Sequence, residues 1–320
     1  MPRRRRTGEQ IAAEVGGSSA AVSRILERLG LNSLLGEREQ MQVAPNPLGS
    51  AVPAESQWAA ALAPGAEPPR FGSAHVIPAD QIGLPSRSVS RAVYRAFEII
   101  VALIGLFVGS PLVLIAALII RLDSPGAALF RHTRPARSVR MRGRDLVGRP
   151  DLIPPPGGYR PDAQYCVPSY FTLVKLRTMY ADARARFPGH YAYKFTRENF
   201  HSQFPTIRDD PRVTRAGRLF RKMSIDELPN LWSVVKGDMA LVGPRPEAPE
   251  VLQYYTPEEM MKFTVKPGIT GLAQIRGRGL LDWGETIALD LEYVRTRSIS
   301  LDIKIIALTI IRVITRHGAF

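Results

Sequence analysis

The chain has 320 residues and a formal net charge of +14, with 43 lysines and arginines against 29 aspartates and glutamates. That length is enough for one large domain or two. The positive charge favours anionic partners, namely nucleic acid, acidic lipid or phosphorylated substrates. Cys166 is the only cysteine of the sequence, which excludes an intramolecular disulfide and argues against a cysteine-based zinc site. The five histidines show no metal-ligand spacing.

Residues 7–31 carry the pattern of two short helices around a glycine turn, Gly16-Gly17. The second helix has apolar residues at helical spacing, at Val22, Ile25, Leu26 and Leu29. This pattern resembles a DNA-binding helix-turn-helix, and the preceding Arg3–Arg6 would suit phosphates. A helical hairpin that contacts a protein explains it as well, since about 25 residues cannot form an independent core. We therefore expect a small helix-turn-helix-like segment at 1–40, with DNA or a protein as its partner.

The next stretch, residues 41–86, is rich in alanine, proline, glycine and serine and contains eight prolines. Proline removes a main-chain donor and clashes inside a helix, which excludes a long helix here. We expect a disordered linker without chemistry of its own. No cleavable secretory signal is expected ahead of it, because Arg3–Arg6 are followed by a polar stretch.

Residues 99–120 are apolar and uncharged throughout. As a helix, such a stretch would reach about 33 Å, enough for a bilayer core of about 30 Å. Pro111 lies at the midpoint, where it removes an amide donor, and both flanks carry arginines, which favour the cytoplasmic side. A helix that enters one leaflet, bends at Ser110 and Pro111 and returns satisfies both observations, and Ser110 would bond a carbonyl freed at the bend. A spanning helix with a proline kink is an equal alternative on these grounds.

Three later stretches have a recognisable local pattern. Phe171–Met179 predicts a strand with Lys175 and Arg177 on one face. The aromatic and basic residues at 187–204 suit either a membrane surface or a core. Residues 299–313 alternate first like a strand and then like an apolar helix, and their charged residues exclude a spanning segment.

The acidic pair Asp226-Glu227 follows a run of basic residues that ends at Arg221-Lys222. A carboxylate forms an acyl phosphate when the phosphoryl group is held and neutralised, and guanidinium groups at this spacing suit that role. Mg²⁺ is usually bound by carboxylate together with substrate phosphate. The competing explanation is structural, because Ser224 and Glu227 have the spacing of a helix capping box. The residues alone therefore indicate a phosphoryl-transfer site beside a membrane.

Eight motifs then follow one another in order. They are Lys175-Leu-Arg-Thr-Met179, Asp210-Pro-Arg-Val-Thr-Arg-Ala-Gly-Arg218, Ser224-Ile-Asp-Glu-Leu-Pro-Asn-Leu231, Lys236-Gly-Asp-Met239, Gly243-Pro-Arg-Pro246, Lys266-Pro-Gly-Ile-Thr-Gly-Leu272, Gly277-Arg278 and Leu291-Glu-Tyr-Val294. Together they resemble the bacterial sugar transferase family, the monotopic polyprenyl-phosphate phosphoglycosyl transferases. The resemblance implies an α+β, mostly helical fold. It comprises a re-entrant membrane helix at 87–125, bent at Ser110-Pro111, and a cytoplasmic catalytic domain at 126–320; a helix is then favoured at 299–313.

The same resemblance implies transfer of a sugar-1-phosphate from a UDP-sugar to undecaprenyl phosphate, with release of UMP. This would be the initiating step of exopolysaccharide, capsule, O-antigen or glycoconjugate synthesis. Asp226 would form a covalent phospho-aspartyl intermediate and bind Mg²⁺, with Glu227 as its catalytic partner. Four basic residues match positions expected to bind phosphate or substrate: Lys175, Arg221, Arg245 and Arg278. The expected location is the cytoplasmic face of the bacterial inner membrane, with membrane lipids as partners and a homodimer as a candidate assembly.

The sequence departs from the family pattern between Phe130 and Lys175, where the family has a short, glycine-marked connection, and at Arg297-Ser298, where an aromatic residue usually precedes the serine. Residues 1–85 match no part of the family core. This N-terminal part supports one alternative function, a membrane-tethered DNA-binding regulator with an inactive transferase domain. Filled catalytic positions speak against that alternative, and no single residue decides which sugar is transferred.

Overall fold

The computed structural model describes residues 74–81, 91–155, 157–191, 195–196, 199–203, 209–277 and 280–315. In this part of the chain, helices are combined with short strands, in agreement with a mostly helical α+β fold. The helix-turn-helix-like segment expected at 1–40 lies outside the described residues, and so does Arg278.

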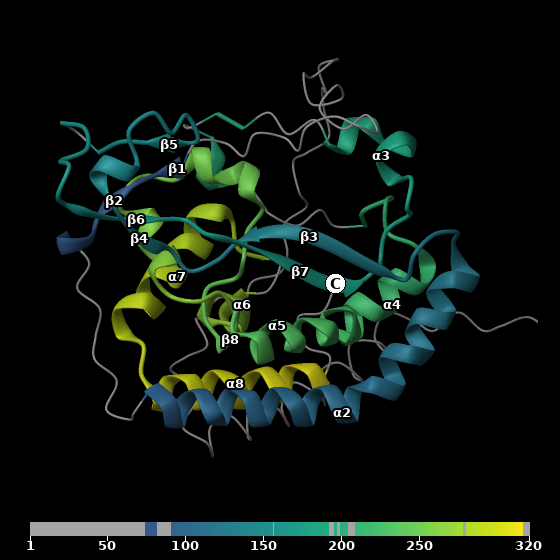
Figure 1. Ribbon diagram of the computed structural model, residues 1–320. Helices are drawn as coiled ribbons and strands as arrows, with labels where there is room; N and C mark the ends of the chain where they lie inside the picture. Colours follow the sequence, from purple (N-terminus) through teal and green to yellow (C-terminus); the bar gives the residue numbers. More distant parts are fainter. Residues whose placement is uncertain are drawn as a thin grey trace, which may run out of the picture.

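The longest element is α2 (Arg91–Asp123), which contains Pro111 in its interior. Figure 1 shows this helix running along the lower edge of the molecule and then bending upward. Proline has no amide hydrogen, so the Phe107 carbonyl, four residues earlier, lacks its helical donor. The Ser110 hydroxyl donates to that carbonyl, with 2.8 Å between the two oxygens. The hydrogen bond expected at the bend is confirmed.

Polar contacts attach the first turns of α2 to the globular part of the protein. Glu98 is buried and accepts a hydrogen bond from the Leu241 amide at 3.0 Å. Tyr94 donates its hydroxyl to Asp302, which lies fully buried in α8 (Ile299–Thr315). Charge-assisted hydrogen bonds shielded from water are strong, and a buried carboxylate that lost its donor would be costly. The start of α2 is therefore fixed to the domain.

The last turns of α2 contact the same domain elsewhere. Asp123 accepts a hydrogen bond from the Ala216 amide at 3.3 Å, in the first turn of α4 (Arg215–Met223). One turn earlier, Ile120 is buried in a hydrophobic cluster that includes Phe220 of α4. Both ends of α2 are thus bound to one globular unit.

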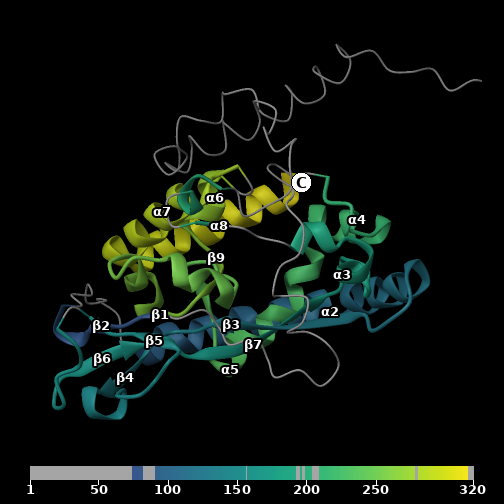
Figure 2. The ribbon, with the colours of Figure 1, turned by 90° about the horizontal axis from the view of Figure 1, so that it is seen from above.

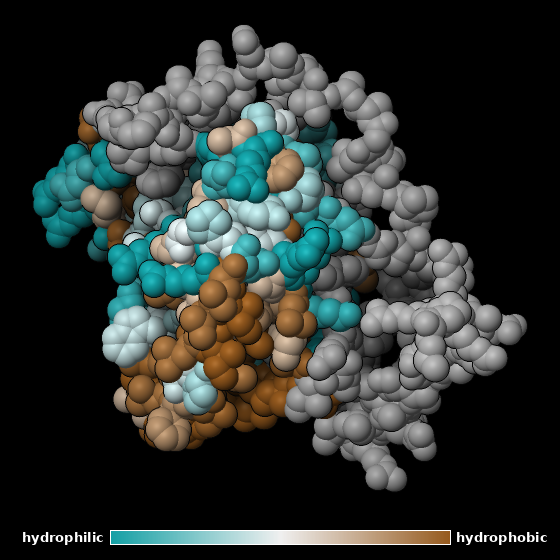
Figure 3. Space-filling view, turned by 90° about the vertical axis from the view of Figure 1, so that its right-hand side faces the viewer, coloured by the Kyte–Doolittle hydropathy of each residue, from teal (hydrophilic) through white to brown (hydrophobic). Residues whose placement is uncertain are grey.

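Between these attachments, α2 has a largely exposed apolar surface. From Ala92 to Asp123 the helix is long and apolar enough to cross a membrane, by length and composition. Its exposed apolar residues in the middle turns are Ile100, Leu103, Ile104, Phe107, Val108, Leu112, Leu114, Ile115 and Leu118. Figure 3 shows hydrophobic residues gathered over the lower part of the molecule. A continuous exposed apolar surface of this kind is typical of a membrane or protein contact.

Two long antiparallel strands, β3 (Leu129–Pro135) and β7 (Tyr170–Leu176), form a ribbon above α2 (Figure 1). The strand expected at Phe171–Met179 is confirmed as far as Leu176. Arg177 follows the strand and donates to the Ser124 carbonyl at 2.8 Å, at the end of α2. Its role is therefore structural, and it does not share the environment of Lys175.

A chain of short helices follows, from α4 through η8 (Ile225–Asn230) to α5 (Leu231–Lys236). Thr214 caps α4 by accepting from the Gly217 amide, and Ser224 ends the helix in a left-handed conformation with φ of 56°. The Ser224 side chain does not cap η8. The capping-box explanation of Glu227 is therefore wrong: Ser224 ends one helix and leaves Glu227 available for another contact.

Two glycine motifs meet in a short parallel pair of strands, β8 (Ala240–Val242) and β9 (Gly268–Thr270). Gly243 follows β8 so close to the other segment that a Cβ atom would lie 2.4 Å from the Lys266 carbonyl oxygen. Only glycine allows this approach. The pairing fixes the start of the Gly243-Pro-Arg-Pro loop, which carries Arg245.

The C-terminal half adds helices beside this pair. In chain order they are η9 (Pro249–Tyr254), η10 (Glu259–Thr264), α6 (Leu272–Gly277), α7 (Trp283–Thr296) and α8. The helix favoured at 299–313 is confirmed by α8, which buries Ile305 and Leu308 but exposes Ile303 and Ile310. Within the 187–204 stretch, Phe200 is fully buried and stacks on Trp283, so core packing explains that aromatic residue.

A small sheet region lies apart from α3 and α4, as Figure 2 shows. It contains β1 (Ala74–His75), β2 (Ile77–Pro78), β4 (Val139–Arg142), β5 (Leu152–Ile153) and β6 (Gln164–Val167). β1 pairs with β5, and β2 pairs with β6. Ala74, Val76 and Ile77 are buried there, so residues 74–81 of the range expected to be a linker belong to the folded domain. The rest of the range 41–86 lies outside the described residues.

The remaining short helices connect these parts: η4 (Ala79–Gln81), η5 (Gly143–Asp145), α3 (Ala183–Arg186), η6 (Pro188–Tyr191) and η7 (Phe200–Ser202).

Candidate active site

The acidic pair lies in the first turn of η8, which packs against β7. Asp226 is only 4% exposed, whereas Glu227 is partly buried. Removing an ionised carboxylate from water is costly unless cations or hydrogen-bond donors surround it. The groups around this pair therefore decide what it can do.

Glu227 forms an ion pair with Arg245, which donates from Nη2 to Oε1 at 2.9 Å. The guanidinium reaches η8 from the loop after β8. Glu227 holds the pKa of Arg245 above its ordinary value, against the effect of burial. The Arg245 side chain is still 43% exposed, so the ion pair faces an open side of the site. A ligand can approach Arg245 from that side.

Lys175 extends from β7 toward the same two carboxylates. Partial burial lowers the pKa of its ammonium group to about 8, while Asp226 and Glu227 oppose that shift. Nearby Arg245 lowers the pKa further. A lysine in such surroundings is stabilised by an added anion, because the anion restores the charge balance that burial disturbs.

Arg221 lies in the last turn of α4 and donates from Nε to the Thr178 hydroxyl at 2.9 Å. Gly217, one turn earlier, is so close to Thr178 that a Cβ atom would come within 2.1 Å of its carbonyl oxygen. Burial lowers the pKa of Arg221, and Asp226 opposes this. Close packing of α4 on this segment therefore orients the guanidinium toward Asp226.

The structure brings together five of the six residues proposed from the sequence for catalysis and phosphate binding: Lys175, Arg221, Asp226, Glu227 and Arg245. The sixth, Arg278, lies outside the described residues. Sequence reasoning missed Arg134 of β3, whose charge lowers the pKa of Lys175, and His132 of the same strand, whose own pKa is lowered by Arg134 and Lys175. The alternation of basic and aromatic residues at 130–134 was the available signal.

The donor set around Asp226 fits Mg²⁺ only together with a substrate. Among the described residues, no group of three or more histidine, cysteine or acidic side chains could hold a metal ion. Mg²⁺ usually takes one or two carboxylates and completes its shell with water and substrate phosphates. Asp226 meets this requirement, while Glu227 is already paired with Arg245.

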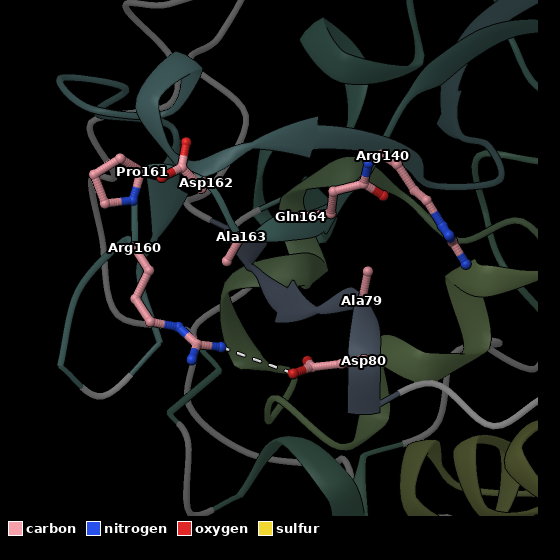
Figure 4. Close-up of a pocket in the computed structure, with 8 residues that line it drawn as sticks. All are labelled: Ala79, Asp80, Arg140, Arg160, Pro161, Asp162, Ala163 and Gln164. Atoms are coloured by element: carbon pink, nitrogen blue, oxygen red, sulfur yellow. Dashed lines mark ion pairs between the residues drawn. The ribbon is translucent and has the colours of Figure 1, made fainter.

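A pocket of 650 Å³ lies in the small sheet region, lined by Ala79, Asp80, Arg140, Arg160, Pro161, Asp162, Ala163 and Gln164 (Figure 4). Arg160 and Asp80 approach to 3.7 Å across it, and both side chains are about 70% exposed. Solvent-exposed charges of this kind are weakly coupled. None of the residues proposed for catalysis lines this pocket, which leaves η8 as the candidate active site.

A buried carboxylate among cations, on a domain that carries an exposed apolar helix, defines a membrane-associated protein suited to phosphate groups. The family model described as "Bacterial sugar transferase" matches residues 89–141 and 167–316. The chain belongs to this family. The unmatched residues 142–166 contain β5 and most of β6, so the small sheet region is partly an insertion into the family fold.

Three relatives illustrate the similarity. An undecaprenyl-phosphate glucose phosphotransferase of Komagataeibacter xylinus is 38% identical over 71% of this chain and 36% of its own length. A UDP-glucose:undecaprenyl-phosphate glucose-1-phosphate transferase of Caulobacter vibrioides is 36% identical over 71% of each chain. An undecaprenyl-phosphate galactose phosphotransferase of Salmonella typhimurium is 32% identical, over 75% of this chain and 44% of its own length. This chain thus matches under half the length of two of these relatives.

Proposed function

We propose that this protein transfers a sugar-1-phosphate from a UDP-sugar to undecaprenyl phosphate and releases UMP, as the initiating step of a surface polysaccharide or glycoconjugate. The observation that carries the proposal is the position of Asp226, buried beside Lys175 and Arg221 on a domain attached to both ends of α2. The relatives named for this reaction support it.

In the first step, an Asp226 carboxylate oxygen attacks the phosphorus atom that carries the sugar. The new bond joins this oxygen to phosphorus, while the bond from phosphorus to the bridging oxygen breaks and its electron pair leaves with UMP. In the second step, an oxygen of undecaprenyl phosphate attacks the same phosphorus and expels the Asp226 carboxylate. Because the phosphoryl group is transferred in two displacements, the lipid phosphate does not have to attack the anionic nucleotide sugar directly.

The basic residues neutralise the charge that both steps develop. Lys175 and Arg221 face Asp226, where the transferred phosphoryl group would lie, and fixed cations in a partly dry site stabilise such charge strongly. Arg245 holds Glu227 and presents the rest of its guanidinium to the open side. Mg²⁺, bound by Asp226 and the diphosphate, would supply further neutralisation. Family resemblance adds Arg278 to the substrate-binding residues.

The proposal places α2 in one leaflet as a re-entrant helix, on the cytoplasmic face of the inner membrane. Two observations support this. The start and the end of α2 both contact one globular unit, which a straight crossing of the bilayer would separate. Its apolar middle turns are exposed, and Ser110 satisfies the carbonyl that Pro111 leaves without a donor. The active site would then lie where lipid phosphate and soluble nucleotide sugar meet.

The test is replacement of the nucleophile. Asp226→Asn is expected to abolish UMP release from UDP-glucose or UDP-galactose in membranes that contain undecaprenyl phosphate, because an amide oxygen cannot form the acyl phosphate. Asp182→Asn, at an exposed aspartate paired with Arg186, is the control and should keep full activity. Incubation of the unaltered protein with UDP-sugar alone should add a hexose phosphate to the peptide containing Asp226. Turnover by Asp226→Asn would refute the nucleophile assignment.

A further inference from the structure

The strand β3 carries three residues beside the candidate active site that the catalytic motifs do not account for. In the antiparallel register Phe130 lies opposite Lys175, His132 opposite Leu173 and Arg134 opposite Phe171. Directly opposed residues in a ribbon project to the same side. Phe130, His132 and Arg134 therefore share the face of Lys175, which is the face toward η8.

Arg134 lies on this face without a direct partner. Its Nε atom is buried, and its side chain forms no hydrogen bond or ion pair with any residue that the structure describes. Three carboxylates act on Arg134 electrostatically: Glu247, Glu250 and Glu227. Glu227 binds Arg245 at 2.9 Å and Glu247 lies 3.5 Å from Lys262, and none of the three forms an ion pair with Arg134. Burial lowers the pKa of Arg134 in spite of Glu247. A partly buried guanidinium with unused donors is costly unless a ligand completes it.

His132 lies two residues before Arg134 on the same face and, like Arg134, has a buried nitrogen without a hydrogen-bond partner among the described residues. Its Nδ1 atom is buried without a hydrogen-bond partner among the described residues, and its ring stacks on Phe130 at 5.8 Å between centroids. Burial, together with Arg134 and Lys175, lowers the pKa of His132 to about 4. The ring is neutral at pH 7 and retains one N–H donor.

We propose that Arg134 and His132 bind a phosphate group of a substrate on the β3 side of the active site, beside Lys175. The guanidinium would take two phosphate oxygens in its fork, and the neutral imidazole would donate to a third. Because this proposal rests on the transferase function, two phosphates qualify: the diphosphate of the nucleotide sugar and the phosphate of the lipid. Both present the same chemistry to β3.

The experiment compares Arg134→Gln and Arg134→Lys with the full-length protein. Arg131→Gln is the matched control, because Arg131 is exposed on the opposite face of the same strand. In Arg134→Gln we expect the KM for one substrate to rise about tenfold or more, as loss of a charge-assisted bidentate contact predicts. A higher KM for UDP-sugar identifies the diphosphate, and a higher KM for undecaprenyl phosphate identifies the lipid. Arg134→Lys should recover part of the loss.

Thermal unfolding separates binding from a structural role. Loss of an unpartnered guanidinium should leave the Tm of Arg134→Gln unchanged or raise it, so a fall in Tm that accounts for the lost activity would overturn the proposal. Unchanged KM values for both substrates would also overturn it.

Titration with inorganic pyrophosphate and with UDP tests binding without turnover. The unaltered protein and Arg131→Gln should bind these anions more tightly than Arg134→Gln does. That difference would hold even if the unaltered protein proved inactive as a transferase, in which case only the proposed reaction fails. Equal binding by all three proteins would overturn the phosphate site on β3.

Discussion

At the residue scale, a change in the ion pair between Glu227 and Arg245 should affect activity much more than stability. Arg245→Gln removes a guanidinium that is 43% exposed, so the free energy of unfolding should change by less than about 1 kcal/mol. The same change frees Glu227 and removes a cation from the substrate side. We expect kcat/KM for UDP-sugar to fall about 100-fold, or about 2.7 kcal/mol of transition-state stabilisation.

A second exposed ion pair provides the control for this change. Arg295 and Glu258 approach to 2.6 Å, and both side chains are more than half exposed. Arg295→Gln therefore removes a similar contact outside the candidate active site. Its kinetics should match those of the unaltered protein. If Arg295→Gln and Arg245→Gln gave the same kcat/KM, Arg245 would have no substrate role.

His132 predicts a dependence of stability on pH. Its pKa in the folded protein, about 4, lies below the ordinary value of 6.5. Between these values the unfolded chain binds a proton that the folded protein excludes. Above pH 6.5 His132 therefore does not lower the free energy of unfolding, and as the pH falls from 6.5 toward 4 it lowers that free energy progressively. The slope can reach about 1.4 kcal/mol per pH unit. His132→Gln should show a smaller loss of stability than the unaltered protein between pH 6.5 and 5, in urea unfolding at each pH.

A histidine outside the site completes that comparison. His190 lies in η6 and stacks edge-on against Phe187. His190→Gln should retain the steep loss of stability that His132 causes. Identical pH profiles for His132→Gln and the unaltered protein would mean that His132 is exposed to water and protonates normally.

At the element scale, the bend of α2 has a testable consequence. Cysteines introduced at Ala92 and Leu122, near the two ends of the helix, should be labelled by an impermeant reagent from the same side of the membrane. Cys166 is buried and gives little background. Pro111→Ala restores a main-chain donor to the Phe107 carbonyl and favours a straight helix. This variant should raise the fraction labelled from opposite sides. Opposite-side labelling without the substitution would refute re-entry.

The sequence predicted α2 and β7 because their patterns are local. An uncharged run specifies an apolar helix, and alternation specifies a strand. η8 was harder to predict, since Ser224 and Glu227 fit a capping box as well as they fit the observed turn. The outcome depends on a tertiary contact: Arg245, far along the chain, takes the Glu227 carboxylate that a capping box would have used. The spacing of residues within one segment cannot show whether Glu227 caps its own helix or binds a distant arginine.

At the scale of the whole molecule, the motifs converge because long-range pairings bring them together. Lys175 and Asp226 could be assigned to one site from the ordered motifs, but the position of Arg134 could not. Arg134 reaches the site only because β3 pairs with β7, although β4, β5 and β6 lie between them in the chain. Nothing in the local sequence fixes that register. The residues at 74–81 were missed for the same reason, since their strands form only by pairing with the insertion.

A buried ion pair links α7 to the loop that carries Arg245. Lys262 is fully buried, lies 2.8 Å from Asp290 of α7 and 3.5 Å from Glu247, two residues after Arg245. Lys262→Met leaves both carboxylates buried without their cation, which should reduce the free energy of unfolding by about 3–5 kcal/mol. Urea unfolding measures this directly. Because Glu247 would also lose its anchor, the KM for UDP-sugar should rise in protein that remains folded.

Two further variants test whether the burial of Lys262 causes the large loss of stability expected for Lys262→Met. Lys236→Met breaks an exposed pair with Asp238, 2.6 Å apart, and should cost less than about 1 kcal/mol. Combining Lys262→Met with Asp290→Leu and Glu247→Leu removes all three buried charges and should recover most of the stability, since apolar replacements of a buried ion pair or triad are often neutral. If Lys262→Met cost no more than Lys236→Met, water would reach the Lys262 site. The connection from α7 through Glu247 to Arg245 would then be wrong.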